Sequence, residues 1–167
     1  MRRHAPLLHP AWGLPVAAAA LAALVVVVMG GTITETGAWY HGLAQPRWSP
    51  PDAAYGVAWT TLYLITACAA VTGWRAIPDR HGAEWMIGLF ALSGLLNIVW
   101  SLLFFRLHRP DWAAIDAVAW WVAIALWIYT LWPRSLAAAL LLLPYLGGVT
   151  FAGYLTMTIA RLNGPFG

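Results

Sequence analysis

Between Ala83 and Phe105 the chain reads AEWMIGLFALSGLLNIVWSLLFF, in which Glu84 is the one charged residue. The hydrocarbon core of a bilayer, about 30 Å thick, needs about 20 mostly apolar residues to be crossed by a helix. The strands of a membrane barrel alternate between polar and apolar residues, and this stretch does not alternate. It therefore predicts a transmembrane helix.

Four other stretches have the same character, and together the five predict an all-α membrane protein built as a five-transmembrane-helix bundle. The expected helices cover residues 14–33, 53–74, 83–105, 112–132 and 136–160. Short links make the last four helices antiparallel to their neighbours. We expect one transmembrane domain over residues 1–167, with an ordered loop over residues 34–52 because this loop holds Trp39, Tyr40, Trp48 and three prolines.

The first stretch has two interpretations. Arg2 and Arg3 precede an apolar run from Val16 to Met29, which is also the pattern of a secretory signal. No clean cleavage site of small residues follows the run, so we favour a helix that is retained in the protein.

The composition excludes several classes of protein. Apolar residues make up 62% of the chain and charged residues 9%, whereas a soluble domain has about 45–50% and about 25%. The net charge of +3 comes from nine arginines that form no basic stripe, which argues against a nucleic-acid partner. The single cysteine excludes an internal disulfide, and the five histidines lie outside the expected spans, so we expect no metal and no cofactor.

Aromatic and polar side chains share faces of the expected helices at helical spacing. These faces hold Tyr55, Trp59, Tyr63 and Thr66; Ser93, Asn97, Trp100, Ser101 and Phe104; and Asp116, Trp120 and Trp127. Amide and carboxyl groups are costly in lipid, so Asn97 and Asp116 should face the bundle interior. Asn97 fits an interhelical contact and a ligand contact equally well. Aromatic stripes usually serve packing, but their number here favours a cavity for a flat apolar ligand.

Two further features have mainly structural interpretations. Asp116 lies about one turn inside its helix, where the helix dipole favours an acid and where Arg106 or Arg109 could pair with it. A second face of the third helix carries small or branched residues, which allow close helix packing in lipid. This face, formed by Ile87, Ala91, Gly94 and Ile98, predicts a homodimer interface, with packing inside one chain as the alternative.

Several segments, taken in order, resemble the TspO/MBR family, whose animal relatives are the translocator protein or peripheral benzodiazepine receptor. The resemblance covers Trp39 to Asn163. It is carried by Trp39-Tyr40, Leu43, Pro46, Trp48 and Pro50-Pro51; by Trp59 with Tyr63; by Asn97, Trp100-Ser101 and Phe104-Phe105; by Pro110, Ala114 and Asp116; and by Pro144-Tyr145-Leu146, Phe151-Ala152 and Arg161-Leu162-Asn163.

The resemblance implies a dimeric five-helix bundle that binds porphyrins, other tetrapyrroles, sterols or benzodiazepine-type drugs beneath the first loop. The matching pocket positions are Trp39, Pro50, Trp59, Tyr63, Asn97, Trp100, Ser101 and Ala152, to which we add Tyr40, Trp127 and Phe151. Trp59 is expected to stack on a flat ring and Asn97 to supply the polar contact, while the loop with Trp39 and Tyr40 acts as a lid. The implied location is a membrane, as a multi-pass protein, most simply the cell membrane of a bacterium.

Two departures from the family pattern affect these expectations. Many relatives carry a Trp where this chain has Gly148, so the pocket is expected to lose one aromatic wall. Six residues separate Tyr154 from Arg161, which breaks the sterol motif in its strict form. The expected function is ligand binding as a sensor, regulator or transporter. A light-dependent porphyrin-degrading enzyme acting through tryptophan is one alternative, and a structural membrane subunit is another.

Overall fold

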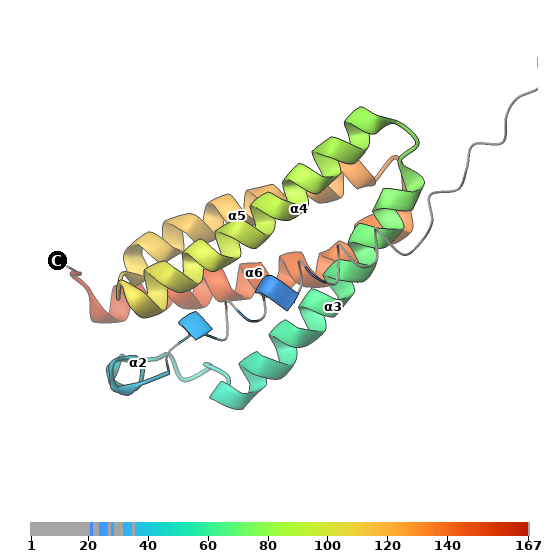
Figure 1. Cartoon of the computed structure of the whole chain (residues 1–167). Helices are drawn as coiled ribbons and strands as arrows, with labels where there is room; N and C mark the ends of the chain where they lie inside the picture. Colours follow the sequence, from blue (N-terminus) through green and yellow to red (C-terminus); the bar gives the residue numbers. More distant parts are fainter. Residues whose placement is uncertain (1–20, 22–23, 27, 29–31, 35, 167) are drawn as a thin grey trace, which may run out of the picture.

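The computed structural model describes residues 21, 24–26, 28, 32–34 and 36–166, and within them every regular element is helical. The elements are α2 (Ala38–Gly42), α3 (Asp52–Ala76), α4 (Arg80–Ser101), the π-helical turn η1 (Leu102–Arg106), α5 (Pro110–Leu131) and α6 (Leu136–Asn163). Figure 1 shows the four long helices side by side, with α2 at the end of the bundle where the C-terminus also lies.

The four long helices agree with four of the five predicted spans to within a few residues. Each is long and apolar enough to cross a membrane, with α4 and η1 together forming one span from His81 to Arg106. The fifth predicted span, residues 14–33, lies mostly outside the described residues, and those of its residues that are described are helical. The structure therefore supports four spans, and the count of five is not confirmed.

Local sequence signals explain where the helices begin. Pro51 is the N-cap of α3 and Pro110 opens α5, both positions where proline is tolerated because the first turn has no backbone acceptor for its missing N–H. The Asp79 carboxylate caps α4 by accepting a hydrogen bond of 2.7 Å from the Gly82 backbone N–H. Ser135 caps α6 in the same way, at 3.2 Å from the Ala138 nitrogen.

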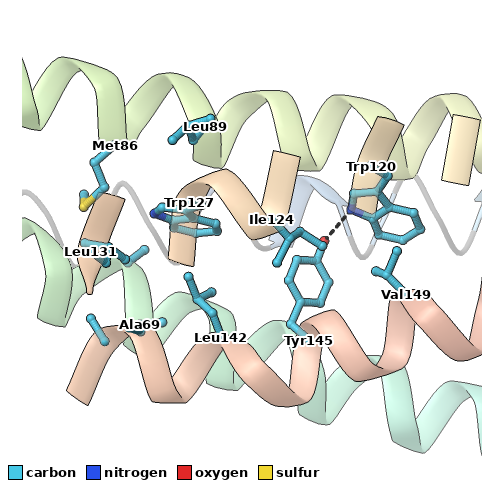
Figure 2. Close-up of a cluster of buried hydrophobic side chains, with 13 residues drawn as sticks. Ala69, Met86, Leu89, Trp120, Ile124, Trp127, Leu131, Leu142, Tyr145 and Val149 are labelled. Atoms are coloured by element: carbon cyan, nitrogen blue, oxygen red, sulfur yellow. Dashed lines mark hydrogen bonds between the residues drawn. The ribbon is translucent and has the colours of Figure 1, made fainter. Parts of the chain in front are cut away.

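The helices pack in the order α3, α6, α5, α4, with the α5–α6 contact the most extensive and few contacts between α3 and α4. The core fills one half of the bundle with large side chains from several helices. Trp120, Trp127 and Leu131 of α5 and Leu142 of α6 have no exposed surface. Figure 2 shows these side chains between the helices, with Met86 and Leu89 of α4 above them.

A small polar network crosses this core. The Trp120 indole N–H lies 3.1 Å from the Tyr145 hydroxyl and 3.2 Å from the Ser93 hydroxyl, and Ser93 donates to Tyr145 at 3.2 Å. The Trp120–Tyr145 bond is the dashed line in Figure 2. A buried polar group without a partner is costly, so this network fixes how α4, α5 and α6 meet.

Candidate ligand-binding cavity

A cavity of about 330 Å³ lies beside the core, between α3, the end of α4 and α6, with α2 over it. Pockets for small molecules commonly have volumes of about 300–1,000 Å³. The lining residues are Val26, Thr34, Thr36, Tyr40, Asp52, Tyr55, Gly56, Trp59, Thr60, Tyr63, Asn97, Trp100, Ser101, Phe104, Phe105, Ala152, Leu155, Thr156 and Ile159. The threonines at 34, 36 and 60, together with Asp52 and Gly56, are exposed and form its rim.

The cavity wall on the α3 side is a rigid aromatic platform. Trp59 lines the cavity and stacks on Trp120, with ring centroids 5.6 Å apart and planes 17° apart. Trp120 is fully buried and hydrogen-bonded, so it holds the Trp59 ring from behind. Tyr63 continues this wall one turn further, 5.8 Å from Trp59. Such a surface suits a flat apolar ligand because stacked rings gain contact area without losing much conformational freedom.

A polar group lies next to this platform. Asn97 of α4 is 3% exposed, and its Oδ1 accepts a hydrogen bond of 3.0 Å from the Tyr63 hydroxyl. Asn97 also lines the cavity, and its Nδ2 has no hydrogen-bond partner among the described residues. The Trp100 indole N–H, on the same wall, is buried and also lacks a partner within the described part of the chain. The Asn97 amide can therefore offer a donor to a ligand that carries an acceptor, whereas the Trp100 N–H is covered by protein.

The π-helical turn η1 contributes a second aromatic wall of the cavity. The Leu107 backbone N–H donates to the Leu102 carbonyl at 2.9 Å, the i to i−5 pattern of a π-turn. Phe104 and Phe105 are both buried on this turn, and both line the cavity. The sequence predicted a continuous α-helix here, because no residue pattern distinguishes a π-turn from an α-helix of the same composition.

The loop between the first two predicted spans covers the cavity through α2. Tyr40 is 5% exposed, lines the cavity and lies 5.8 Å from the Phe105 ring. Burial raises the pKa of the Tyr40 hydroxyl above its usual value, so this side chain stays neutral at physiological pH. Trp39 points elsewhere, since it stacks on His108 at 4.1 Å and is absent from the lining.

Three other predicted ligand contacts also lie away from the cavity. Trp127 is fully buried in the core, 5.5 Å from Phe90, because it lies two turns beyond Trp120 along α5. Phe151 is 41% exposed and packs edge-on against Trp48, since it is rotated by about 100° from Ala152 on α6. Pro50 precedes α3 without lining the cavity.

The remaining predicted contacts are brought together. Tyr40, Trp59, Tyr63, Asn97, Trp100, Ser101 and Ala152 all line the cavity. The sequence analysis missed Leu155, Thr156 and Ile159 of α6 as lining residues. Their spacing from Ala152, at i+3, i+4 and i+7, is the signal that could have found them.

Two structural expectations need correction. Arg109 does not pair with Asp116; it binds both carboxylate oxygens of Asp111, at 2.8 and 2.5 Å, because the two residues lie two positions apart at the start of α5. Asp116 is half-buried, and its Oδ2 has no partner within the described residues. Gly148 does not border the cavity either, because it lies at the α3–α6 crossing, where a Cβ would come 2.5 Å from Leu62 Cδ1.

The predicted dimer face divides into two parts. Ile87 and Ala91 of α4 are exposed. A Cβ at Gly94 would lie 3.3 Å from Val26 Cγ2, so this position packs within the chain, and Ile98 is half-buried.

Comparison with known proteins agrees with this architecture. The sequence profile of the TspO/MBR family matches residues 15–162. The chain belongs to the TspO/MBR family. It is therefore a multi-pass integral membrane protein, and clusters of aromatic side chains lie within it.

Relatives of this TspO/MBR protein occur in bacteria and animals. It is 38% identical to the tryptophan-rich protein TspO of Chlorobaculum tepidum over 146 residues, which cover 84% of this chain and 90% of that protein. It is 31% identical to the protein CrtK of Rhodobacter capsulatus over 133 residues, covering 80% and 83% of the two chains. It is also 31% identical to the human translocator protein over 126 residues, 75% of each.

Proposed function

We propose that this protein binds a flat apolar ligand of the porphyrin or other tetrapyrrole class in the cavity and acts as a membrane sensor, regulator or transporter. The observation that carries the proposal is that Trp59, backed by Trp120, and Asn97 line the same cavity, and that no described residue bonds the Asn97 Nδ2. A planar ring fits against the indole, while a carbonyl or carboxylate on the ligand accepts from the amide. The name of one relative, the tryptophan-rich sensory protein of Cereibacter sphaeroides, supports a sensory role.

The exposed rim would allow a ligand that is longer than the cavity to extend out of it. Thr34, Asp52 and Thr60 are exposed at one side of the cavity, so part of a macrocycle can extend between α3 and the preceding segment. In this arrangement Tyr40 covers the ligand from the loop side, and Ala152 leaves room on α6.

The proposal includes two features of the whole chain. First, residues 14–33 form a fifth span. The match to the family profile, which begins at residue 15, supports this, and so does Val26, which lines the cavity. Second, the protein forms a homodimer through the outer face of α4, supported by exposed Ile87 and Ala91 in a lipid-facing position.

Tryptophan fluorescence tests ligand binding directly. We expect protoporphyrin IX to quench the purified wild-type protein saturably at micromolar concentration, and Trp59→Ala to weaken binding about two- to tenfold, since one aromatic stack is worth about 0.5–1.5 kcal/mol. Trp85→Ala is the matched control, because Trp85 is 59% exposed near the start of α4 and does not line the cavity. No saturable quenching would contradict the proposal. Equal affinities in the two variants would show that the ligand binds away from Trp59, and a structural subunit would show no ligand response in any of the three proteins.

Light-dependent porphyrin degradation is the second candidate function. It is favoured by the stacked pair of Trp59 and Trp120, which places two indoles in succession beside the cavity. Illuminated incubation with protoporphyrin IX, followed by absorbance spectra, decides between the two functions. Decay of the porphyrin spectrum at the rate seen with a control membrane protein would remove the enzymatic interpretation.

A further inference from the structure

The end of α6 holds the loop over the cavity by a two-way hydrogen-bond clasp. Asn163, the last residue of α6, accepts a hydrogen bond of 2.8 Å on Oδ1 from the Ala44 backbone N–H. Its Nδ2 donates to the Ala44 carbonyl at 2.9 Å and to the Ile159 carbonyl at 2.8 Å. Both donors of the amide and one of its two acceptor lone pairs are therefore used, which fixes its orientation.

An aromatic contact fastens the same loop to the same helix. Trp48 stacks on Tyr154 with ring centroids 5.4 Å apart and planes 19° apart, and it meets Phe151 edge-on at 5.8 Å. Residues 43–49 thus contact α6 at Asn163, the last residue of the helix, and again about two and a half to three turns earlier, at Tyr154 and Phe151. In Figure 1 the segment that includes α2 lies at this end of the bundle.

Both segments joined by the clasp, the end of α6 and the loop at Ala44, are linked to residues that line the cavity. On the helix side, Ile159 lines the cavity, and its carbonyl is held by the Asn163 amide. On the loop side, the Leu43 backbone N–H donates to the Tyr40 carbonyl at 3.2 Å, directly before Ala44. The position of Tyr40 over the cavity therefore depends on where Ala44 is held.

We propose that Asn163 is the positioning residue for the lid, defined as residues 36–51. The clasp holds Ala44 so that Tyr40 closes the cavity, and ligand exchange requires the clasp to break. This inference rests on the proposed ligand-binding function and adds the element that controls how fast the ligand enters and leaves.

The substitution Asn163→Asp keeps the shape of the side chain and removes both donors. It also places a carboxylate oxygen against the Ala44 and Ile159 carbonyls, so the clasp should open. We expect the association and dissociation rate constants of protoporphyrin IX each to rise about tenfold, while the dissociation constant changes less than about threefold. Leu162→Ala is the matched control, because Leu162 is 53% exposed on the same turn and takes no part in the clasp.

A second variant breaks the clasp without changing α6. Ala44→Pro removes the backbone N–H that Asn163 accepts, and the extended backbone of Leu43, with ψ of 136°, suits a residue that precedes proline. It should raise both rate constants in the same way. If Asn163→Asp fails to fold, this variant decides the question by itself.

Hydrogen–deuterium exchange of the ligand-free protein in lipid nanodiscs supplies a readout that needs no ligand. Amides of residues 38–44 should exchange about tenfold faster in Asn163→Asp than in Leu162→Ala, while amides in the middle of α5 keep their protection. Equal exchange in the two variants would overturn the clasp. Failure of the wild type to bind protoporphyrin IX would remove the proposed function, and exchange alone would then decide the role of Asn163.

Discussion

Asn97 and Tyr63 connect α4 to α3 through one hydrogen bond at the cavity wall. The Tyr63 hydroxyl donates to Asn97 Oδ1 at 3.0 Å, between helices that otherwise have few contacts. The two interpretations of Asn97, as an interhelical contact and as a ligand contact, are therefore compatible, because Tyr63 engages Oδ1 and no described residue bonds Nδ2.

This bond carries a prediction about stability. Tyr63→Phe leaves Asn97 Oδ1 without its donor, and we expect a loss of about 0.6–1.5 kcal/mol in the free energy of unfolding. Tyr154→Phe is the control, because Tyr154 is 61% exposed and the change keeps its ring on Trp48. Reversible unfolding in mixed micelles, followed by circular dichroism, measures both. Equal stability of the two variants would show that the bond contributes nothing.

Helical spacing identified the inward residues well, but it could not place them along the bundle. Trp120 and Trp127 share one face of α5, and both are buried. Only Trp120 lies near the cavity, where it backs Trp59, because the two residues are separated by about two helical turns. Whether an inward residue lies in the core or beside the cavity depends on where along the bundle the neighbouring helices separate, and helical spacing in a single sequence does not give that position.

At the level of the helices, α3 and α6 cross closely at Gly148, the position where the sequence analysis expected the pocket to lose an aromatic wall. Gly148 leaves space that Leu62 fills, since a Cβ there would come 2.5 Å from Leu62 Cδ1. The sequence showed that an indole was absent from this position. It could not show that the neighbouring helix moves into the gap, because packing between helices depends on both partners.

The crossing predicts how the two adjacent glycines respond to substitution. Gly148→Trp overpacks the α3–α6 contact and should cost about 1–3 kcal/mol of unfolding free energy. Gly147→Trp should be tolerated, because no atom lies within 4 Å of a Cβ at Gly147. Removing the obstructing side chain in Leu62→Ala/Gly148→Trp should recover part of the loss. Thermal unfolding of the four proteins forms the test, and equal loss in both glycine variants would contradict the close crossing.

The helix limits were predictable for physical reasons, and η1 was not. Pro51, Asp79, Pro110 and Ser135 mark the starts of the four long helices, each by a proline or a cap that the sequence displays. The π-turn at residues 102–106 has no comparable signal. Its formation places Phe104 and Phe105 together on the cavity, which is a property of the packed bundle.

At the level of the whole molecule, the packing of the chain limits where a second copy can bind. Four residues of α4 were predicted to form the dimer interface, but Gly94 packs against Val26 and Ile98 is half-buried. The outer face that remains exposed includes Ile87, Ala91 and Leu95, with Leu95 57% exposed. A dimer through α4 should therefore be centred on Ala91.

Cysteine cross-linking in membranes tests this interface. The exposed native cysteine is first removed by Cys68→Ser, and single cysteines are then introduced by Ala91→Cys, Gly94→Cys and Val122→Cys. Ala91→Cys should form a covalent dimer at least about tenfold faster than Val122→Cys, because Val122 is exposed on α5, outside the proposed interface. Gly94→Cys should react slowly, since Val26 covers it. Because a two-fold interface brings the same residue of both copies together, equal rates at positions 91 and 122 would indicate random collision in the bilayer and exclude the α4 dimer.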